Sequence, residues 1–194
     1  YMGLVDEGNK INFYDGKIRV VAPDGKEFAK FPADHYLDHV AEHVEPWTYC
    51  KLPYLKKIGW KGLSVGKESG IYRVGPLARL NVSEGFTTPL AQKEYKKFYE
   101  FFKQKPVHST LAYHWARLIE LLYAAEHLLE LSQDKEITNK DIRAMPKEKE
   151  EKESVGVGVV EAARGTLLHH YVLDEKKLIK KVNLVVATTH NHPG

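Results

Sequence analysis

The residues best suited to chemistry lie near the end of the sequence, in two short signatures. The first is E-A-A-R-G-T-L-L-H from Glu161 to His169, and the second is T-T-H-N from Thr188 to Asn191. Arginine carries a permanent charge and five N–H donors, and a threonine hydroxyl is a further hydrogen-bond donor. Arg164 and Thr188 can therefore serve one common site, provided that the chain brings the two signatures together.

A hairpin between the two signatures meets that condition. Apolar residues alternate with polar ones on both flanks, and the polar cluster from Asp174 to Lys177 marks the reversal. Because the far ends of a hairpin meet, we expect Arg164 and Thr188 to face one site. A simpler interpretation stays open, in which Glu161 and Arg164 form a buried ion pair that holds a corner of the fold.

The rest of the chain predicts an α+β fold, with helices segregated from antiparallel hairpins. Residues 1–31 hold short strand-like runs separated by Asp-Gly turns, which indicates a β-meander. Residues 33–132 are predicted to be mainly helical, with helices over 33–44, 87–103 and 109–132 and an irregular aromatic segment over 45–70. Residues 133–154 end in KEKEEKES and are predicted to be a solvated, charged connector. Residues 155–194 hold the hairpin.

Two of these helices require a choice between a structural and a functional interpretation. His35, His39 and His43 recur every four residues, a spacing that can hold a metal on one helix face. Acidic residues alternate with them, so solvated surface groups are the better interpretation. The helix over 109–132 has an apolar stripe that we assign to the core. The stripe consists of Leu111, Trp115, Leu118, Leu121, Leu122, Ala125, Leu128 and Leu129.

Composition narrows the classes of function. The 194 residues are 43% hydrophobic, which is enough for one domain with a buried core. The 29 basic and 26 acidic side chains are interspersed, which argues against a nucleic-acid partner. No run approaches the roughly 18 apolar residues that span a bilayer, so we expect no membrane association and a cytoplasmic location. Cys50 is the only cysteine, so neither a disulfide nor a thiolate cluster can form within the chain.

Three segments together resemble the large subunit of nickel–iron hydrogenases: R-V-G-P-L-A-R-L-N at 73–81, E-A-A-R-G-T-L-L-H at 161–169 and V-V-A-T-T-H-N at 185–191. The aromatic stretch from Glu45 to Lys56 resembles the cytoplasmic group, which reduces viologen or a cofactor. The similarity extends over essentially the whole chain and implies part of a larger mixed large-subunit fold. The family's cysteine motifs, R-x-C-x-x-C and D-P-C-x-x-C, are missing, and Cys50 alone cannot bind nickel and iron. We therefore expect an internal fragment of a longer protein that is inactive alone.

The resemblance implies roles around a nickel–iron centre with cyanide and carbon monoxide ligands, where H2 is cleaved to protons and electrons. Arg164 matches the catalytic arginine whose guanidinium lies over the open side of the metals. Thr188 matches the residue whose hydroxyl donates to an iron-bound cyanide, and the backbone near Ala163 and Ala187 would complete these contacts. Many relatives have proline at both alanine positions, and proline lacks the N–H that alanine keeps.

The resemblance also implies less direct roles. Glu161 and His169 match family positions and would orient the corner that carries Arg164. The backbone carbonyl of Leu184 matches a ligand of a structural magnesium ion, whose other ligands lie outside this chain. No metal or other cofactor is expected to bind to the isolated chain. Three further histidines are interpreted as surface groups: His170, His190 and His192.

The partners implied are an electron-transfer subunit together with an iron–sulfur small subunit, and H2 is the implied substrate. Without these partners, the chain is expected to expose apolar surface and to self-associate. Two alternatives stay open. One is a relative without metals, such as the quinone-site subunit of respiratory complex I, which is a structural and coupling element that typically has Lys at the position of Arg164. The other is an unrelated interaction domain in which Glu161 and Arg164 are a buried pair.

Overall fold

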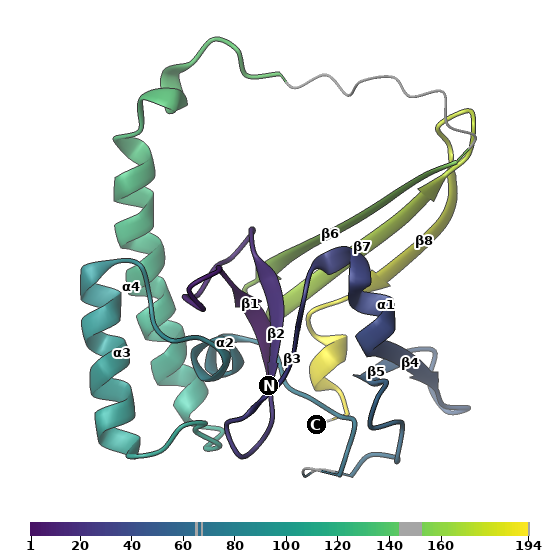
Figure 1. Cartoon of the computed structure of the whole chain (residues 1–194), viewed down its shortest axis with the longest axis horizontal. Helices are drawn as coiled ribbons and strands as arrows, with labels where there is room; N and C mark the ends of the chain where they lie inside the picture. The colour runs from purple at the N-terminus through teal and green to yellow at the C-terminus, as the bar shows by residue number, and fades with distance from the viewer. Residues whose placement is uncertain (65, 67, 144–152, 194) are drawn as a thin grey trace.

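The computed structural model describes residues 1–64, 66, 68–143 and 153–193. Figure 1 shows small antiparallel sheets and a separate group of helices, with the two long helices on one side of the molecule. The α+β fold predicted from the sequence is therefore confirmed. No described helix combines the length and the apolar character that crossing a lipid bilayer requires.

The first sheet forms where the sequence predicts a β-meander. It consists of β1 (Met2–Val5), β2 (Lys17–Val21) and β3 (Glu27–Phe31). The strands pair antiparallel in the order β1-β2-β3, as expected for short runs joined by tight turns. Leu4 and Ile18 lie opposite each other and are fully buried, so this sheet supplies one wall of the core.

The predicted helix over 33–44 is wrong in its second half. The chain forms a 3-10 turn, η1 (Ala33–His35), then a single α-helical turn, α1 (Tyr36–His39), and then two paired strands, β4 (Val40–Val44) and β5 (Lys51–Leu55). Val40 lies opposite Leu55 in this antiparallel pair, and both side chains are buried. Strand pairing and burial therefore override the helical spacing, as β-branched residues often allow.

The histidines of this segment consequently do not share a helix face. His39 ends the helical turn and stacks on Phe31, with ring centroids 3.9 Å apart. His43 lies on β4 and stacks on Trp60 at 4.5 Å. Within the described ranges, no group of three or more His, Cys, Asp or Glu side chains is arranged to hold a metal ion.

The helices follow in the order α2 (Pro76–Val82), α3 (Pro89–Phe102) and α4 (Ala112–Ser132). The first two begin with proline, whose missing N–H costs nothing at the first helical position. Glu126 of α4 accepts the N–H groups of Leu90 and Ala91 at 2.9 Å, which satisfies two donors at the start of α3. A second core lies between these helices and includes Leu77, Leu80, Phe98 and Ile119.

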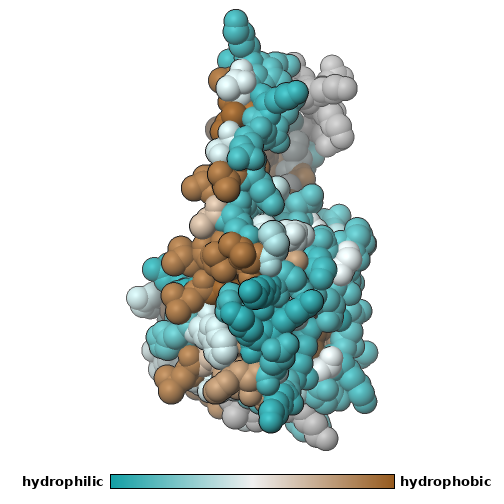
Figure 2. Space-filling view, turned by 90° about the vertical axis from the view of Figure 1, so that its left-hand side faces the viewer, coloured by the Kyte–Doolittle hydropathy of each residue, from teal (hydrophilic) through white to brown (hydrophobic). Residues whose placement is uncertain are grey.

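The predicted apolar stripe of α4 is mostly not core. Its leucines at 111, 118, 121, 128 and 129 are each at least 60% exposed, and Figure 2 shows apolar side chains gathered along this side of the molecule. Ala112, Ala116, Ile119, Glu120 and Tyr123 are the residues buried instead. Because α4 is apolar around most of its circumference, helical spacing does not select the buried face. Small side chains allow the other helices to approach α4 on the alanine side.

The end of the chain forms three strands, whereas the sequence predicts a single hairpin. They are β6 (Ser154–Ala162), β7 (Gly165–Leu173) and β8 (Ile179–Val185), paired antiparallel in that order. The predicted reversal near Asp174 joins β7 to β8, but a second reversal after Ala162 joins β6 to β7. Of the predicted connector, residues 133–143 are exposed and include the 3-10 turn η2 (Lys135–Thr138), and residues 144–152 lie outside the described part.

The first and third sheets share one core. Leu168 of β7 and Val185 of β8 are buried against residues of the first sheet and against Tyr72 and Val74. Tyr72 and Val74 lie in an extended segment before α2.

Candidate functional site

Arg164 lies in a two-residue turn between β6 and β7. Ala162 is paired with Gly165, so Ala163 and Arg164 form the turn, and both are exposed. Gly165 has a φ of +134°, a conformation that residues with a side chain rarely adopt. A Cβ at this position would lie 2.2 Å from Cγ2 of Val74. The glycine therefore allows the turn to lie directly against Val74.

The strand end before this turn is held by the buried side chain of Arg79 on α2. Its Nε and Nη2 donate to the two carboxylate oxygens of Glu120 on α4, at 2.6 and 2.7 Å. Its Nη1 donates to Glu161 Oε2 at 2.7 Å and to the carbonyl of Ala162 at 2.9 Å. Burial lowers the pKa of Arg79, but Glu120 and Glu161 outweigh this and raise it above its ordinary value. The guanidinium therefore stays charged and joins two helices to the strand that leads to Arg164.

Glu161 binds three other elements and not Arg164. Its Oε1 accepts the N–H of Leu4 at 2.9 Å and the hydroxyl of Thr166 at 2.8 Å, and its Oε2 accepts from Arg79. Burial raises the pKa of this carboxyl, and the positive charge of Arg79 acts against the rise. The interpretation of Glu161 and Arg164 as a buried ion pair is therefore wrong, because Arg79 is the partner and Arg164 is exposed.

The second signature follows β8 in a loop that ends in the 3-10 turn η3 (Thr189–Asn191). Ala187 is buried, whereas the Thr188 side chain is exposed. The carbonyl of Thr188 accepts the N–H of Asn191 at 3.1 Å, which closes the turn. Thr188 is therefore an exposed residue on a loop that is closed by a backbone hydrogen bond.

One extended segment, Tyr72–Gly75, contacts this loop, and we call it the strap. The N–H of Val74 donates to Asn191 Oδ1 at 2.9 Å, and the Tyr72 hydroxyl lies 2.6 Å from Nδ1 of His190. His190 is fully buried, so its interpretation as a surface histidine is wrong. Burial lowers the pKa of His190 to about 4, so the ring is neutral at pH 7.

The strap also contacts the turn that carries Arg164. Gly75 has a φ of +100°, and a Cβ there would lie 3.1 Å from the carbonyl oxygen of Arg164. A Cβ on Gly165 would in turn lie 2.8 Å from the backbone nitrogen of Gly75. These two glycines allow two backbones to touch where side chains would hold them apart. The two signatures are thus both set against one short segment, and each presents an exposed donor side chain, Arg164 or Thr188.

The other residues singled out from the sequence lie away from this turn. His169 is on β7 opposite Gly158 and Leu184, and its Nδ1 lies 3.0 Å from the hydroxyl of Tyr171. A role for His169 in orienting the arginine corner stays a prediction, as does the role of the Leu184 carbonyl. His170 is partly buried, with Nδ1 3.0 Å from the hydroxyl of Tyr36, so it is not a simple surface group.

Arg79 and Glu120 have no role assigned from the sequence, although both leave a trace in it. Arg79 lies within R-V-G-P-L-A-R, one of the three segments that carry the resemblance. Glu120 is an acidic residue between Ile119 and Leu121 in an apolar stretch of helix. A charge in such a place is rarely buried unless it is paired. Their contact joins residues 41 positions apart, which no local pattern indicates.

The site offers hydrogen-bond donors and a permanent positive charge, and such donors suit the surroundings of a metal centre with anionic ligands. They are not themselves metal ligands. The one cysteine of the chain, Cys50, is only partly exposed and immediately precedes β5. A single cysteine cannot form a thiolate cluster within these 194 residues.

Comparison with known proteins gives one consistent result. The family model described as nickel-dependent hydrogenase matches residues 7–194. The chain is 48% identical over 192 residues to an F420-non-reducing hydrogenase iron-sulfur subunit of Archaeoglobus profundus, and the match covers 99% of this chain and 39% of that protein. It is 43% identical over 191 residues to the NAD-reducing hydrogenase HoxS subunit beta of Cupriavidus necator, with 98% of this chain and 38% of that protein covered.

Solved structures agree with this result. A crystal structure of an NAD+-reducing [NiFe]-hydrogenase in the H2-reduced state matches with a TM-score of 0.84 and 39% identity, over 98% of this chain and 40% of that chain. The [NiFeSe]-hydrogenase of Dm. baculatum matches with a TM-score of 0.61 and 21% identity, over 97% of this chain and 41% of that chain, which shows the fold alone. The chain spans about two fifths of the length of the curated relatives that it matches.

Proposed function

The chain belongs to the nickel-dependent hydrogenase family, and on that premise we propose that it is part of a catalytic large subunit. The parent enzyme would cleave H2 reversibly to protons and electrons at a nickel–iron centre with cyanide and carbon monoxide ligands. This chain would supply charge and hydrogen-bond donors around the centre. One observation carries the proposal: the Arg164 turn and the Thr188 loop lie against the same strap, and both side chains are exposed.

Arg164 would be the catalytic residue. Its guanidinium is charged at any physiological pH and presents planar donors, which suits it to donate to a cyanide ligand and to polarise a molecule at the open side of the metals. The exposed side chain on an anchored turn supports this role. The hydrogen bond from Arg79 to the Ala162 carbonyl holds the backbone before Arg164. The exposed Arg164 side chain would therefore project from a fixed backbone.

Thr188 would donate its hydroxyl to a second cyanide, and the backbone N–H groups near Ala163 and Ala187 would add to these contacts. Ala163 is in the same turn as Arg164, and Ala187 precedes Thr188. Because alanine keeps the N–H that proline lacks, both positions retain a backbone donor. Glu161 would act by holding the strand end. The Leu184 carbonyl would bind a magnesium ion whose other ligands belong to the rest of the large subunit.

Arg164→Lys in the full-length enzyme with its partner subunits tests the catalytic role. We expect turnover of H2 to fall by several orders of magnitude while nickel and iron contents stay unchanged. The reason is that lysine keeps the charge but loses the planar set of donors, which matters most in the transition state. Turnover per nickel atom, measured after metal analysis, checks the prediction.

Arg143→Lys is the matched control, because Arg143 is exposed on the segment after η2 and not on the strap, the turn or the loop. Near-normal turnover of Arg164→Lys would remove the proposed role. A second test distinguishes a metal-containing enzyme from a metal-free relative with a structural role. If the reading frame around residues 1–194 encodes no cysteine pairs, a metal-free relative with a structural role becomes the better proposal.

The proposed partners are an electron-transfer subunit together with an iron–sulfur small subunit. The relatives are named as subunits, which supports assembly with other chains. The exposed leucines of α4 support burial of that face in the parent assembly. In isolation the same face should cause self-association, and sedimentation at increasing concentration would show it. A monomer at all concentrations would contradict this expectation. Location in the cytoplasm stays a prediction.

A further inference from the structure

Arg79 is placed to act on Arg164 through the backbone. We propose that Arg79 is a positioning residue: its guanidinium holds the carbonyl of Ala162 and the carboxylate of Glu161 and thereby aims the Arg164 side chain. The inference rests on the proposed function, because aiming Arg164 matters only if Arg164 acts at the metal centre. It adds a residue on α2 to a site otherwise built from the turn and the loop.

The bonds of Arg79 act on the two residues that lead into the turn. Nη1 donates to Glu161 Oε2 at 2.7 Å and to the Ala162 carbonyl at 2.9 Å, and Ala162 is two positions before Arg164. The next carbonyl, that of Ala163, accepts from Nη1 of Arg117 on α4 at 3.4 Å. On the other side of the turn, the strap packs against the backbone of Arg164 at Gly75. A shift of the guanidinium would therefore move the backbone from which Arg164 projects.

Glu120 gives the guanidinium a single orientation. Both of its carboxylate oxygens accept from Arg79, at 2.6 and 2.7 Å, which is the paired geometry that a planar fork of donors requires. Arg79 is 2% exposed and Glu120 is 7% exposed, so water competes little for these bonds. A lysine in place of Arg79 would keep the charge but could not bind Glu120, Glu161 and Ala162 in the same plane.

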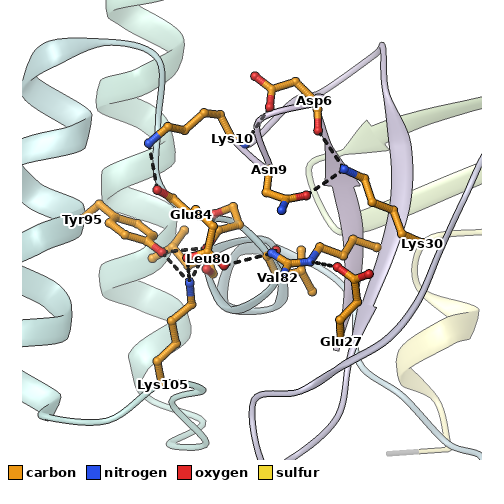
Figure 3. A network of polar contacts seen from close by, with 12 residues as sticks. Asp6, Asn9, Lys10, Glu27, Lys30, Leu80, Val82, Glu84, Tyr95 and Lys105 are labelled. Atoms are coloured by element: carbon orange, nitrogen blue, oxygen red, sulfur yellow. Dashed lines mark hydrogen bonds and ion pairs between the residues drawn. The ribbon is translucent and has the colours of Figure 1, made fainter.

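A second arginine network in the chain separates a structural from a positioning role. Arg19 on β2 donates to Glu27 at 2.8 Å, to Glu84 at 3.0 Å and to the carbonyl of Val82 at 2.6 Å, and these partners are labelled in Figure 3. Like Arg79, Arg19 thus binds two carboxylates and one backbone carbonyl. Its partners lie on β3, at the end of α2 and two residues after α2, and do not include any residue of the β6–β7 turn. Arg19→Lys is therefore the matched control for Arg79→Lys.

The test uses the full-length enzyme with its partner subunits and compares Arg79→Lys, Arg19→Lys and Arg164→Lys. For Arg79→Lys we expect turnover per nickel atom to fall about 10- to 100-fold, as for other residues that orient groups around a metal. Infrared bands of the iron-bound cyanides should shift, because the Arg164 turn moves relative to them. Arg19→Lys should change neither, and it should lower the melting temperature less than Arg79→Lys, because the carboxylates of Glu27 and Glu84 are 44% and 52% exposed.

Each outcome decides the proposal. If Arg79→Lys matches Arg19→Lys in turnover and in the cyanide bands, while Arg164→Lys is inactive, Arg79 is purely structural and only this inference fails. If Arg164→Lys retains turnover, the proposed function itself fails. Should Arg79→Lys not load nickel, Glu120→Gln decides, because it keeps Arg79 and removes one bond that orients it. A drop in turnover of about 10-fold with shifted bands then supports the proposal, and unchanged values overturn it.

Discussion

The two ends of the β6–β7–β8 sheet are held in opposite ways. We call the end of the sheet that carries the Arg164 turn the near end, and the end that carries the reversal after Asp174 the far end. At the near end, groups from distant parts of the chain hold the Arg164 turn: Arg79, the strap and the N–H of Leu4 bound to Glu161. At the far end, residues 175–178 are exposed, and the reversal is closed by bonds among Asp174, Lys177 and Leu178, with one contact outside it, from Lys177 Nζ to Ser154 Oγ at 3.2 Å. Figure 1 shows this far end extending away from the other elements.

Burial along the strands follows the same division. The first two residues of β7, beside the Arg164 turn, are buried, and its last five are only partly buried. In β8, Val185 at the near end is the buried residue. Long-range contacts thus make the near end part of the core, whereas local bonds are enough for the far end. A turn that must aim a functional side chain gains most from the first arrangement, because contacts from several directions restrict its motion.

The largest effect should come from Gly165→Ala at the near end. The new Cβ would lie 2.2 Å from Val74 Cγ2 in a backbone with a φ of +134°. Strain and overpacking together should cost on the order of 4 kcal/mol of unfolding free energy. Urea denaturation of the 194-residue chain measures this loss.

Gly156→Ala on β6 is the control for that substitution. Nothing lies within 4 Å of a Cβ at Gly156. Alanine there should stabilise the chain by about 0.5 kcal/mol or leave it unchanged. Equal losses for both glycines would show that the near end is not packed as tightly as the strap contacts indicate.

His190→Phe should change how stability depends on pH. In the unfolded state, His190 binds a proton once the pH falls below its ordinary pKa of 6.5. In the folded state, burial lowers the pKa of the ring to about 4, so it binds a proton only near pH 4. The unfolded state therefore binds more protons in this range, and stability falls as the pH falls from about 6.5 to 4. This group alone should contribute on the order of 3 kcal/mol to the fall.

The variant should lose that share of the pH dependence. Urea denaturation at a series of pH values, with wild type and His190→Phe side by side, measures the difference. His35→Gln is the control, because His35 is exposed on η1. If the unfolding free energy of His190→Phe depends on pH as steeply as that of the wild type, the near end does not keep this histidine neutral.

Asp174→Ala at the far end should have the smallest effect. Asp174 Oδ1 accepts the N–H groups of Lys176 and Leu178, both at 2.9 Å, in a turn open to water. Its loss should cost about 1 kcal/mol or less. Amide hydrogen exchange should accelerate at Lys176 and Leu178 and stay unchanged at Gly165, and faster exchange at both ends would show that the ends are coupled.

The same division explains how much can be predicted from the sequence. The reversal near Asp174 is predictable because its signals are local, a polar cluster between alternating apolar runs. The Arg164 turn is not predictable as a turn, because its determinants are Arg79, Gly75 and Val74, about 90 residues earlier. Sequence alone pairs Glu161 with a nearby cation, and its true partner is 82 positions away.

Helix α4 and the histidines show a related lesson. The sequence predicts the helix itself but not its buried face, because apolar residues lie on most sides and only packing distinguishes them. Sequence alone places His190 on the surface, whereas its burial depends on Tyr72, 118 positions away. In the described residues, sequence patterns are thus reliable for local features and incomplete for contacts between distant segments.

The outer edge of β8 has a consequence for the behaviour of this chain at high concentration. In the part of the chain that the structure describes, the sheet order is β6-β7-β8, so one long side of β8 has no neighbouring strand, and Ile179, Val182 and Leu184 on β8 are exposed. Such an edge is a template for another strand and a starting point for fibres. Lys181 carries a positive charge on the same strand, whereas the charge of Lys180 is paired with Glu153. Lysine on an edge strand disfavours pairing with a copy of the same edge, so the sequence itself carries a safeguard against strand-to-strand aggregation.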